Sequence, residues 1–404
     1  MPEKYYIGLT SCYHDSSLAL VNEKGEVVFA EASERYLQNK RAISTAADNY
    51  FFVKKVLKEY PMSDYEIGYI STAFNSVFKH LTASLIVYTI RNYVRFTKWV
   101  GEKIRGQNGD TYASALDFQY SPHFALRTIA GTTIRHILNT KYDLLYKATE
   151  DFDHHLCHAY HGYFTSPCTS ATIIVIDGYG DEFSSYSVYT AREQTITQVF
   201  RNKTRISLGD FYGELTWLCG FDAVGGEQWK VMGMAPYGKK REDLYADFNK
   251  WIYTNGIELK ARRSQFHIEF RKKIKEKHYG ELKREDLAFT GQLFYEEIVK
   301  QLINAIHLKW PNNNLIIAGG CALNSAGNGK IHTGTPFKNV YVPSAPADDG
   351  CAIGAALLSF KKHNPGKTIP YDQHNPYLGF DIKEEDIVMM AQFSGYDHEK
   401  AEYP

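Results

Sequence analysis

One local pattern occurs twice in the chain, about half a chain apart, and it constrains the fold more than any single motif. The first copy is an expected strand over Tyr5–Leu9, a polar turn over Thr10–Ser17 and a hairpin. The second copy is a strand over Thr172–Ile176, a turn rich in Gly and Asp over Asp177–Glu182, and a hairpin over Ser184–Phe200. Such a duplication predicts two similar α/β lobes that face each other across a cleft.

The chain length of 404 residues is enough for two to three domains. We expect an N-terminal lobe over residues 1–168, a C-terminal lobe over 169–369 and a linker or fragment over 370–404. An aromatic and basic segment near Phe78–Ile104 is an expected helical insertion in the first lobe. It could shape an acceptor pocket or an oligomer contact, but an amphipathic covering helix is the simpler interpretation.

Composition excludes several classes of function. The chain has 46 basic and 46 acidic residues, so its net charge gives no reason to expect nucleic acid or a membrane surface as a partner. Six cysteines without paired spacing indicate a reduced, cytoplasmic setting. No signal peptide is visible, and the most apolar run, Leu81–Val100, is interrupted by charged residues.

Outside the repeated pattern, apolar periodicity predicts helices over Asn49–Tyr60 and Phe289–Ile306. It also predicts strands over Tyr142–Lys147 and Val340–Pro343. Residues 239–287 are charged, and we expect them to be mostly helical and peripheral.

A histidine-rich helical turn precedes the second copy of the pattern. His154 and His158 are four residues apart, so on a helix they share one face, as metal ligands often do. His161 lies near the same face, and spacing alone leaves open which two would bind. The imidazoles could instead form hydrogen bonds in the core. A zinc peptidase helix is disfavoured because its general base, a Glu after the first His, is replaced by His155.

Polar turns follow the expected strands of the second lobe. Asp177 ends an apolar strand, where open α/β sheets bind their ligands. The turn Gly319–Asn324 could let the backbone approach a ligand closely, although a structural turn explains it equally well. Asp348 and Asp349 stand before an expected helix, so one should cap it while the other faces the cleft.

Two further polar positions are candidates for substrate contact. Lys230 lies in a loop rich in Gly and could contact a phosphate or a carbonyl oxygen, although a solvated lysine is the alternative. His14 and Asp15 lie in the first polar turn, and the duplication would place them across the cleft from Asp177. A turn stabilised by bonds from the Asp15 side chain is the simpler alternative.

Eight stretches stand in order along nearly the whole chain: HDSSLALV (14–21), SERYLQNKR (33–41), HHLCHAYHGYFTSP (154–167), IDGYGDE (176–182), WKVMGMAPYG (229–238), GGCALN (319–324), PADDGCAIGAAL (346–357) and NPYLG (375–379). Together they resemble the O-carbamoyltransferase family of nodulation-factor and antibiotic biosynthesis. The main domain of that family is similar to the tRNA threonylcarbamoyl-transfer proteins, and through them to actin and the sugar kinases. The resemblance thus implies a duplicated, actin-like α/β fold with two lobes.

The resemblance also implies site residues. A divalent metal, usually Fe(II), with Mn(II) or Zn(II) as alternatives, would be bound by His154, His158, Asp177 and Asp348, with Asp349 as the alternative to Asp348. The nucleotide of ATP or of a carbamoyl adenylate would face Gly319, Gly320 and Asn324. Its carbamoyl and phosphate end would lie near Gly178 and Lys230. The acceptor side would be lined by His14 and Lys40.

The implied reaction transfers a carbamoyl group from carbamoyl adenylate, made from carbamoyl phosphate and ATP, to a hydroxyl of a small-molecule acceptor. The metal would polarise the carbamoyl carbonyl, and His14 would orient or deprotonate the hydroxyl. The alternatives are an ATPase or kinase of the actin-like superfamily and a non-catalytic nucleotide-binding partner subunit.

Three departures from the family pattern affect these expectations. Family members continue into a YrdC-like domain that makes the adenylate, whereas this chain ends at Pro404. We therefore expect a truncated chain, one half of a split enzyme with a separate adenylating subunit, or an altered function. Ser33 replaces an acid, and Gln228 and Trp229 replace small residues.

Overall fold

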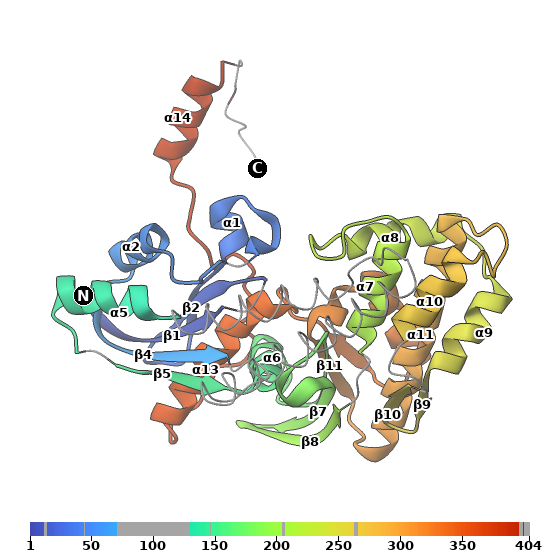
Figure 1. Ribbon diagram of the computed structural model, residues 1–404. Helices are drawn as coiled ribbons and strands as arrows, with labels where there is room; N and C mark the ends of the chain where they lie inside the picture. Colours follow the sequence, from blue (N-terminus) through green and yellow to red (C-terminus); the bar gives the residue numbers. More distant parts are fainter. Residues whose placement is uncertain are drawn as a thin grey trace, which may run out of the picture.

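The computed structural model describes residues 1–11, 14–43, 45–70, 130–145, 147–203, 207–261, 266–395 and 399. The predicted insertion near Phe78–Ile104 lies outside these residues, as does the apolar run Leu81–Val100. Figure 1 shows two sheets with helices α6 (His154–Thr165) and α13 (Cys351–His363) near the centre of the molecule.

The first sheet has the strand order β3-β2-β1-β4-β5. Strand β1 (Glu3–Thr10) pairs antiparallel with β2 (Ser17–Val21), which pairs antiparallel with β3 (Val27–Ala32). On its other side β1 runs parallel to β4 (Met62–Ile70), and β4 runs parallel to β5 (Thr149–Phe152). This edge of the sheet is therefore parallel, while the opposite edge is a hairpin.

The strand predicted over Tyr142–Lys147 is wrong. Helix α5 (Thr132–Tyr142) extends to Tyr142 and ends at Asp143, which adopts a left-handed conformation. The edge strand forms at Thr149–Phe152 instead. This strand is mostly half-buried and carries no alternation of apolar and polar residues, so no periodic signal marks it in the sequence.

The second sheet has the strand order β12-β11-β6-β7-β8. Strand β6 (Ser170–Ile176) pairs antiparallel with β7 (Ser184–Arg192), and β7 pairs antiparallel with β8 (Thr195–Lys203). Strand β11 (Asn314–Ala318) runs parallel to both β6 and β12 (Asn339–Tyr341).

Read from its hairpin edge, each sheet has the same plan of three consecutive antiparallel strands followed by two parallel ones. The duplication predicted from the sequence is confirmed. The protein thus has the two-lobed, actin-like α/β fold that the pattern predicts.

Helices cover both faces of each sheet, as expected for strands that are apolar on both sides. Helix α2 (Tyr50–Glu59) and α5 pack on one face of the first sheet, and α13 packs on the other. Helix α6 packs on one face of the second sheet, and α7 (Leu208–Leu218) and α11 (Arg284–Lys309) pack on the other.

Helices α6 and α13 cross at Gly354, and this crossing joins the two lobes. A Cβ atom placed on Gly354 would lie 2.0 Å from the carbonyl oxygen of Cys157, so only glycine allows the two backbones to approach so closely. A single hydrophobic cluster includes Tyr6 of the first sheet, Ile173 of the second and Ala352 of α13. The lobes therefore share a core at this crossing.

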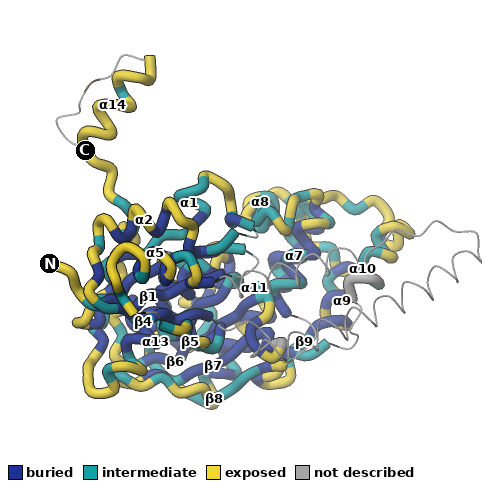
Figure 2. Tube along the Cα trace, turned by 60° about the vertical axis from the view of Figure 1, so that its left-hand side comes forward, coloured by how far each residue is buried: buried dark blue, intermediate teal, exposed yellow. Residues whose placement is uncertain are grey.

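The remaining helices lie around this core. They are α1 (Ser33–Leu37), α8 (Gln228–Met234), α9 (Glu242–Trp251), α10 (Phe266–Lys275), α12 (Ser325–Gly334) and α14 (Glu384–Ser394). A small hairpin of β9 (Ile252–Asn255) and β10 (Glu258–Ala261) follows α9, so the segment 239–287 is mostly helical within its described part. Figure 2 shows α14 standing away from the body and exposed.

Among the described residues, no helix has both the length and the apolar character needed to cross a membrane.

Candidate metal centre

Helix α6 begins at two aspartates that bind its free backbone N–H groups. The Asp153 carboxylate is the N-cap and accepts from the backbone N–H of Leu156 at 2.9 Å. The Asp181 carboxylate accepts from the backbone N–H of His154 at 2.7 Å. Negative charge at a helix N-terminus is stabilising, so the first turn, which carries His154, is firmly positioned.

Two carboxylates reach this turn from separate loops at one edge of the second sheet. Asp177 directly follows β6, and Asp348 begins a short 3₁₀ helix in the loop between β12 and α13. Because β6, β11 and β12 are parallel, their carboxyl ends lie at the same edge, as the sequence predicts for Asp177.

The donor atoms of these four side chains all lie within 4.8 Å of one another. Nε2 of His154 is 2.9 Å from Oδ2 of Asp177 and 3.5 Å from Oδ1 of Asp348. Nε2 of His158 is 3.8 Å from Oδ2 of Asp177 and 3.5 Å from Oδ1 of Asp348. The structure thus brings together all four residues predicted as metal ligands.

These separations fit a single bound cation. Ligand atoms about 2.1 Å from one ion lie about 3.0 Å apart at neighbouring octahedral positions and about 3.4 Å apart in a tetrahedron. The observed separations of 2.9, 3.5, 3.5 and 3.8 Å fall close to these values. Imidazole and carboxylate donors together suit Fe(II), Mn(II) or Zn(II).

The state of His158 supports the same conclusion. Its side chain is fully buried, and within the described part of the chain neither ring nitrogen has a hydrogen-bond partner. A buried polar group without a partner is costly, and ligation of an ion would remove that cost. The residues present therefore fit a divalent metal.

The electrostatics of Asp177 also favour a charged carboxylate at this position. Burial alone would raise its pKa, but the hydrogen bond with His154 and the neighbouring imidazoles hold the pKa well below its usual range. Its other oxygen, Oδ1, accepts from the backbone N–H of Gly320 at 3.0 Å. Asp177 is therefore anionic and oriented.

Two further histidines of α6 stay outside the donor group. His155 points to β7, where its Nδ1 is 2.8 Å from Oγ of Ser187. Burial, and then the neighbouring His154, lower the pKa of His155 well below its ordinary value. His161 packs against Gly350, and burial followed by the effect of His158 lowers its pKa to about 3. Both imidazoles are therefore neutral.

The structure distinguishes Asp348 from Asp349, which spacing could not do. The Asp348 carboxylate faces the histidines, whereas Oδ1 of Asp349 accepts from the backbone N–H of Gly350 at 3.1 Å and lies outside the donor group. Burial, reinforced by Asp15, Asp348 and Glu34, raises the pKa of Asp349 to about 7. The prediction that one of the two acids caps the following helix is wrong, because the N-cap of α13 is Gly350 and no side chain caps it.

The first lobe contributes His14 to the edge of this group. Nδ1 of His14 lies 2.8 Å from Oδ2 of Asp15 and 3.8 Å from Oδ2 of Asp348. Nη2 of Arg41 donates to Asp15 at 3.1 Å. Burial would raise the pKa of Asp15, but His14 and Arg41 outweigh it and lower the pKa to about 2.

Lys40 and Lys230 converge on a different side chain, Trp229. Their Nζ atoms lie 5.7 Å and 5.6 Å from the indole centroid, and the indole is 56% exposed. Lys40 also donates to the carbonyl oxygen of Gly226 at 2.9 Å, while Lys230 pairs with Glu227. Since Lys40 belongs to the first lobe and Lys230 to the second, the pair bridges the lobes.

The glycines predicted to face the nucleotide (Gly319 and Gly320) and its carbamoyl and phosphate end (Gly178) lie beside Asp177. Gly319 has a φ of 89°, and a Cβ atom there would lie 2.3 Å from the carbonyl oxygen of Ile176, so the turn requires glycine. Its N–H donates to Pro346 at 2.8 Å, which joins this turn to the loop of Asp348. Gly178 has open space where a side chain would stand, and the first turn of α7 abuts it at Gly209.

Asn324 has a role that the sequence did not predict. Its Oδ1 accepts from the N–H of Gly327 at 2.9 Å and so caps α12. Its amide also exchanges two hydrogen bonds with Gln292, of 2.9 and 3.0 Å. The side chain is buried and these contacts orient it within the protein.

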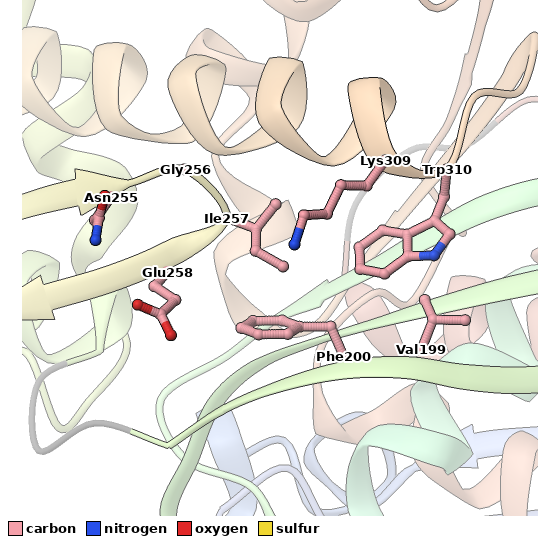
Figure 3. A pocket seen from close by; sticks show the side chains of 8 residues that line it. All are labelled: Val199, Phe200, Asn255, Gly256, Ile257, Glu258, Lys309 and Trp310. Atoms are coloured by element: carbon pink, nitrogen blue, oxygen red, sulfur yellow. The ribbon is translucent and has the colours of Figure 1, made fainter.

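A cavity of about 290 Å³ lies away from the donor group, between β8, the β9–β10 turn and the end of α11. Figure 3 shows its lining, in which Lys309 and Trp310 stand opposite Phe200 and Val199.

Sequence reasoning missed two residues at the centre. Asp181 positions His154, and the signal available was its place in the same polar turn as Asp177. Cys351 follows the Asp348–Gly350 turn directly, and its sulfur lies within 4.8 Å of donor nitrogens of both His154 and His158. A small apolar-looking residue at the start of a helix carries no such signal in a sequence.

A family model described as "Carbamoyltransferase N-terminus" matches residues 5–357, which is most of the chain and includes every residue of the donor group. The chain belongs to the carbamoyltransferase N-terminus family. The resemblance inferred from the ordered motifs is confirmed.

Relatives of this carbamoyltransferase-family chain include proteins from several organisms. An uncharacterized protein of Synechocystis is 28% identical over 95% of the chain and 62% of its own length. One from Methanocaldococcus jannaschii is 26% identical over 94% of the chain and 67% of its own length. The nodulation protein NolNO of Sinorhizobium fredii is 29% identical over 58% of the chain and 34% of its own length. The chain thus spans about two thirds or less of the length of these relatives.

Among solved structures, this chain is similar to the activator of 2-hydroxyisocaproyl-CoA dehydratase from Clostridium difficile. The TM-score is 0.45 and the sequence identity 14%, and the match covers 89% of this chain and 96% of that one. Full-length HypF has a TM-score of 0.48 and 9% identity, over 91% of this chain and 56% of that one.

Proposed function

We propose that this chain transfers a carbamoyl group from carbamoyl adenylate to a hydroxyl of a small-molecule acceptor at the centre formed by His154, His158, Asp177 and Asp348. Membership in the carbamoyltransferase family supports carbamoyl transfer as the general chemistry. The observation that carries the proposal is the convergence of four donor atoms, from one helix and two loops, within 4.8 Å.

The two imidazoles and two carboxylates would bind a divalent cation, with Fe(II) favoured over Mn(II) and Zn(II) by the family resemblance. Such a cation, when bound, supplies Lewis acidity for the carbamoyl carbonyl and for the negative charge that develops on its oxygen. Asp177 is kept anionic by its neighbours, which suits it to charge-neutralising ligation.

His14 is the proposed general base. Its Nδ1 faces the Asp15 carboxylate at 2.8 Å, which selects the tautomer with the proton on Nδ1 and leaves the lone pair on Nε2. Nη2 of Arg41 donates to the same oxygen of Asp15, so the carboxylate that orients the imidazole is itself held in place. An acceptor hydroxyl placed beside His14 and Asp348 would transfer its proton to Nε2 as it attacks the carbamoyl carbon.

The adenylate would lie along the glycine turns. Gly178, Gly319 and Gly320 leave the backbone open to close approach, and the N-terminal turn of α7 beside Gly178 offers N–H groups to a phosphate. Lys230 and Lys40 would add positive charge at the phosphate and acceptor sides. The bond between the carbamoyl carbon and the phosphate oxygen would break, and AMP would leave with its electron pair. The Asn324 side chain is hydrogen-bonded to Gln292 and Gly327, so we propose a nucleotide contact only with the backbone of its turn.

The carbamoyl adenylate would come from carbamoyl phosphate and ATP. We propose that an adenylating module of the YrdC-like type, separate from residues 1–404, performs that step.

The test supplies carbamoyl adenylate directly to the purified chain. Metal-free protein, loaded anaerobically with Fe(II), Mn(II) or Zn(II), is incubated with sugar, aminoglycoside and nucleoside acceptors, and AMP and carbamoylated product are followed by chromatography and mass spectrometry. We expect acceptor-dependent AMP release that is lost in His158→Ala and reduced about a hundredfold or more in His14→Gln. The matched control His332→Ala changes an exposed histidine of α12 and should retain activity.

Two outcomes would contradict the proposal. If the wild type hydrolyses ATP and His158→Ala does so at the same rate, the protein would be an ATPase or kinase. Tight binding of the adenylate without turnover with any acceptor or metal would indicate a nucleotide-binding subunit.

A further inference from the structure

The two histidines of the candidate centre belong to a second group of potential ligands. The sulfur of Cys351 lies within 4.8 Å of donor nitrogens of His154 and His158, and all three residues are buried. Cys351 is the first residue of α13, and its Sγ is 4.0 Å from the backbone carbonyl oxygen of His154. The crossing of α6 and α13 therefore presents a thiol to the same imidazoles that face the carboxylates.

A buried cysteine is in most cases only a small apolar side chain. Here a second observation indicates a ligand. His158 is fully buried, and within the described residues neither of its ring nitrogens has a hydrogen-bond partner. A nitrogen of this unpartnered imidazole lies within the group that includes the sulfur. The thiol thus stands beside an imidazole that has no hydrogen-bond partner among the described residues and that can bind a cation.

The position on α13 also suits a negative sulfur. The 13-residue helix begins at Cys351, and the peptide dipoles at a helix N-terminus favour negative charge. The thiolate is the form of cysteine that binds metals.

The two groups share their imidazoles but differ in their remaining donors. Asp177 and Asp348 offer hard carboxylate oxygens, whereas Cys351 offers a soft sulfur. Soft ligands select soft cations, such as Cd(II), and also suit Zn(II). The same pair of histidines can therefore bind a hard cation with the carboxylates or a soft cation with the thiol.

We propose that Cys351, together with His154 and His158, coordinates soft divalent cations. On binding, the thiol proton leaves to solvent, a sulfur lone pair forms the bond to the cation, and no oxidation state changes. This site goes beyond carbamoyl transfer and shares only the two histidines with the proposed transferase centre, so it can be tested without carbamoyl donor or acceptor.

The first experiment titrates Cd(II) into the metal-free full chain and follows thiolate-to-cadmium charge-transfer absorption in the near ultraviolet. We expect one equivalent to produce the band in the wild type. Cys351→Ser should lose the band and bind Cd(II) at least about tenfold more weakly. The matched control is Cys157→Ala, because Cys157 is equally buried and belongs to the same small cluster but lies outside the donor groups. It should keep the band.

A further variant separates the two groups. Asp348→Asn removes a carboxylate but leaves the thiol, so the cadmium band should persist while the affinity for Mn(II) falls. Circular dichroism and the Tm of each variant report whether it folds. Persistence of the band in Cys351→Ser, or its loss in Cys157→Ala, would overturn the proposal.

X-ray absorption of the wild-type chain loaded with one equivalent of Zn(II) covers the case in which Cys351→Ser does not fold. We expect one sulfur neighbour at about 2.3 Å beside nitrogen neighbours. A shell of nitrogen and oxygen only would reject sulfur coordination, yet leave the proposed transferase reaction open to its own assay.

Discussion

Nε2 of His154 lies 2.9 Å from Oδ2 of Asp177, although His154 begins α6 and Asp177 stands after the end of β6. The same nitrogen lies 3.5 Å from Asp348, which is far away in the sequence. Without a cation, the imidazole and the first carboxylate form a buried hydrogen-bonded pair. With a cation bound, both would become ligands, so we expect the occupancy of the centre to govern the stability of the protein.

Metal removal tests this relationship. A ligand that binds only the folded state stabilises it, by about 2.7 kcal/mol at a hundredfold excess over its Kd. We expect the Tm to rise with Mn(II) concentration and to fall again after chelation. His158→Ala should abolish this dependence because it removes one of the four donors, whereas the exposed His332→Ala should preserve it. A wild-type Tm that does not change with metal concentration would contradict the proposed metal centre.

Asp349→Asn should change the pH dependence of stability in the metal-free protein. Burial, and then Asp15, Asp348 and Glu34, raise the pKa of Asp349 from an ordinary 3.8 to about 7. The unfolded chain therefore loses this proton near pH 4, whereas the folded chain keeps it to about pH 7. Stability must fall as pH rises through this window, by up to about 4 kcal/mol.

Asparagine cannot ionise, so the variant should gain stability relative to the wild type between pH 4.5 and pH 8 in urea unfolding experiments. If the difference in unfolding free energy between the two proteins stays constant across this range, the pKa of Asp349 is not raised.

Asp15→Asn should have the opposite pH dependence. Burial alone would raise the pKa of Asp15, but the hydrogen bond from His14 and the charge of Arg41 lower it to about 2. The stabilisation is complete above pH 4 and is lost as pH falls toward 2, because the folded state resists protonation that the unfolded state accepts. It amounts to about 2 kcal/mol.

Asp15→Asn should therefore be less stable than the wild type at pH 5 and approach it at pH 3, as measured by urea unfolding. A deficit that stays constant between these two pH values would mean that lost packing, rather than lost charge, causes it.

Gly354→Ala should disturb the crossing of α6 and α13. The added Cβ would stand 2.0 Å from the carbonyl oxygen of Cys157, so the helices must move apart. Overpacking of this kind costs about 3 kcal/mol, and the movement would separate His158 from Asp348. We expect a lower Tm and weaker Mn(II) binding, measured by calorimetry.

The matched control is Gly329→Ala. Gly329 lies within α12, and a Cβ atom there meets nothing within 4 Å. Alanine is favoured over glycine inside a helix, so this variant should be as stable as the wild type or slightly more stable. Equal effects of the two substitutions would argue against a tight crossing at Gly354.

Much of the fold could be predicted because its signals are local. The repeated strand, polar turn and hairpin marked both sheets, and Asp177 was correctly placed at the end of β6. The edge strand Thr149–Phe152 was missed because a half-buried strand at the edge of a sheet needs no alternating pattern. The helix cap expected from Asp348 or Asp349 was wrong because the chain enters α13 through a 3₁₀ turn.

The sequence by itself determined the spacing of His154 and His158 on one helical face, since the period of an α-helix depends only on the backbone. It also determined the order of the family motifs and the polar turns that end the strands. The tertiary structure alone decided that Asp348 rather than Asp349 meets the histidines, that His161 stays outside, and that Cys351 reaches them. These outcomes depend on how α13 packs across α6, and packing between segments far apart in the chain leaves no periodic signal in either segment.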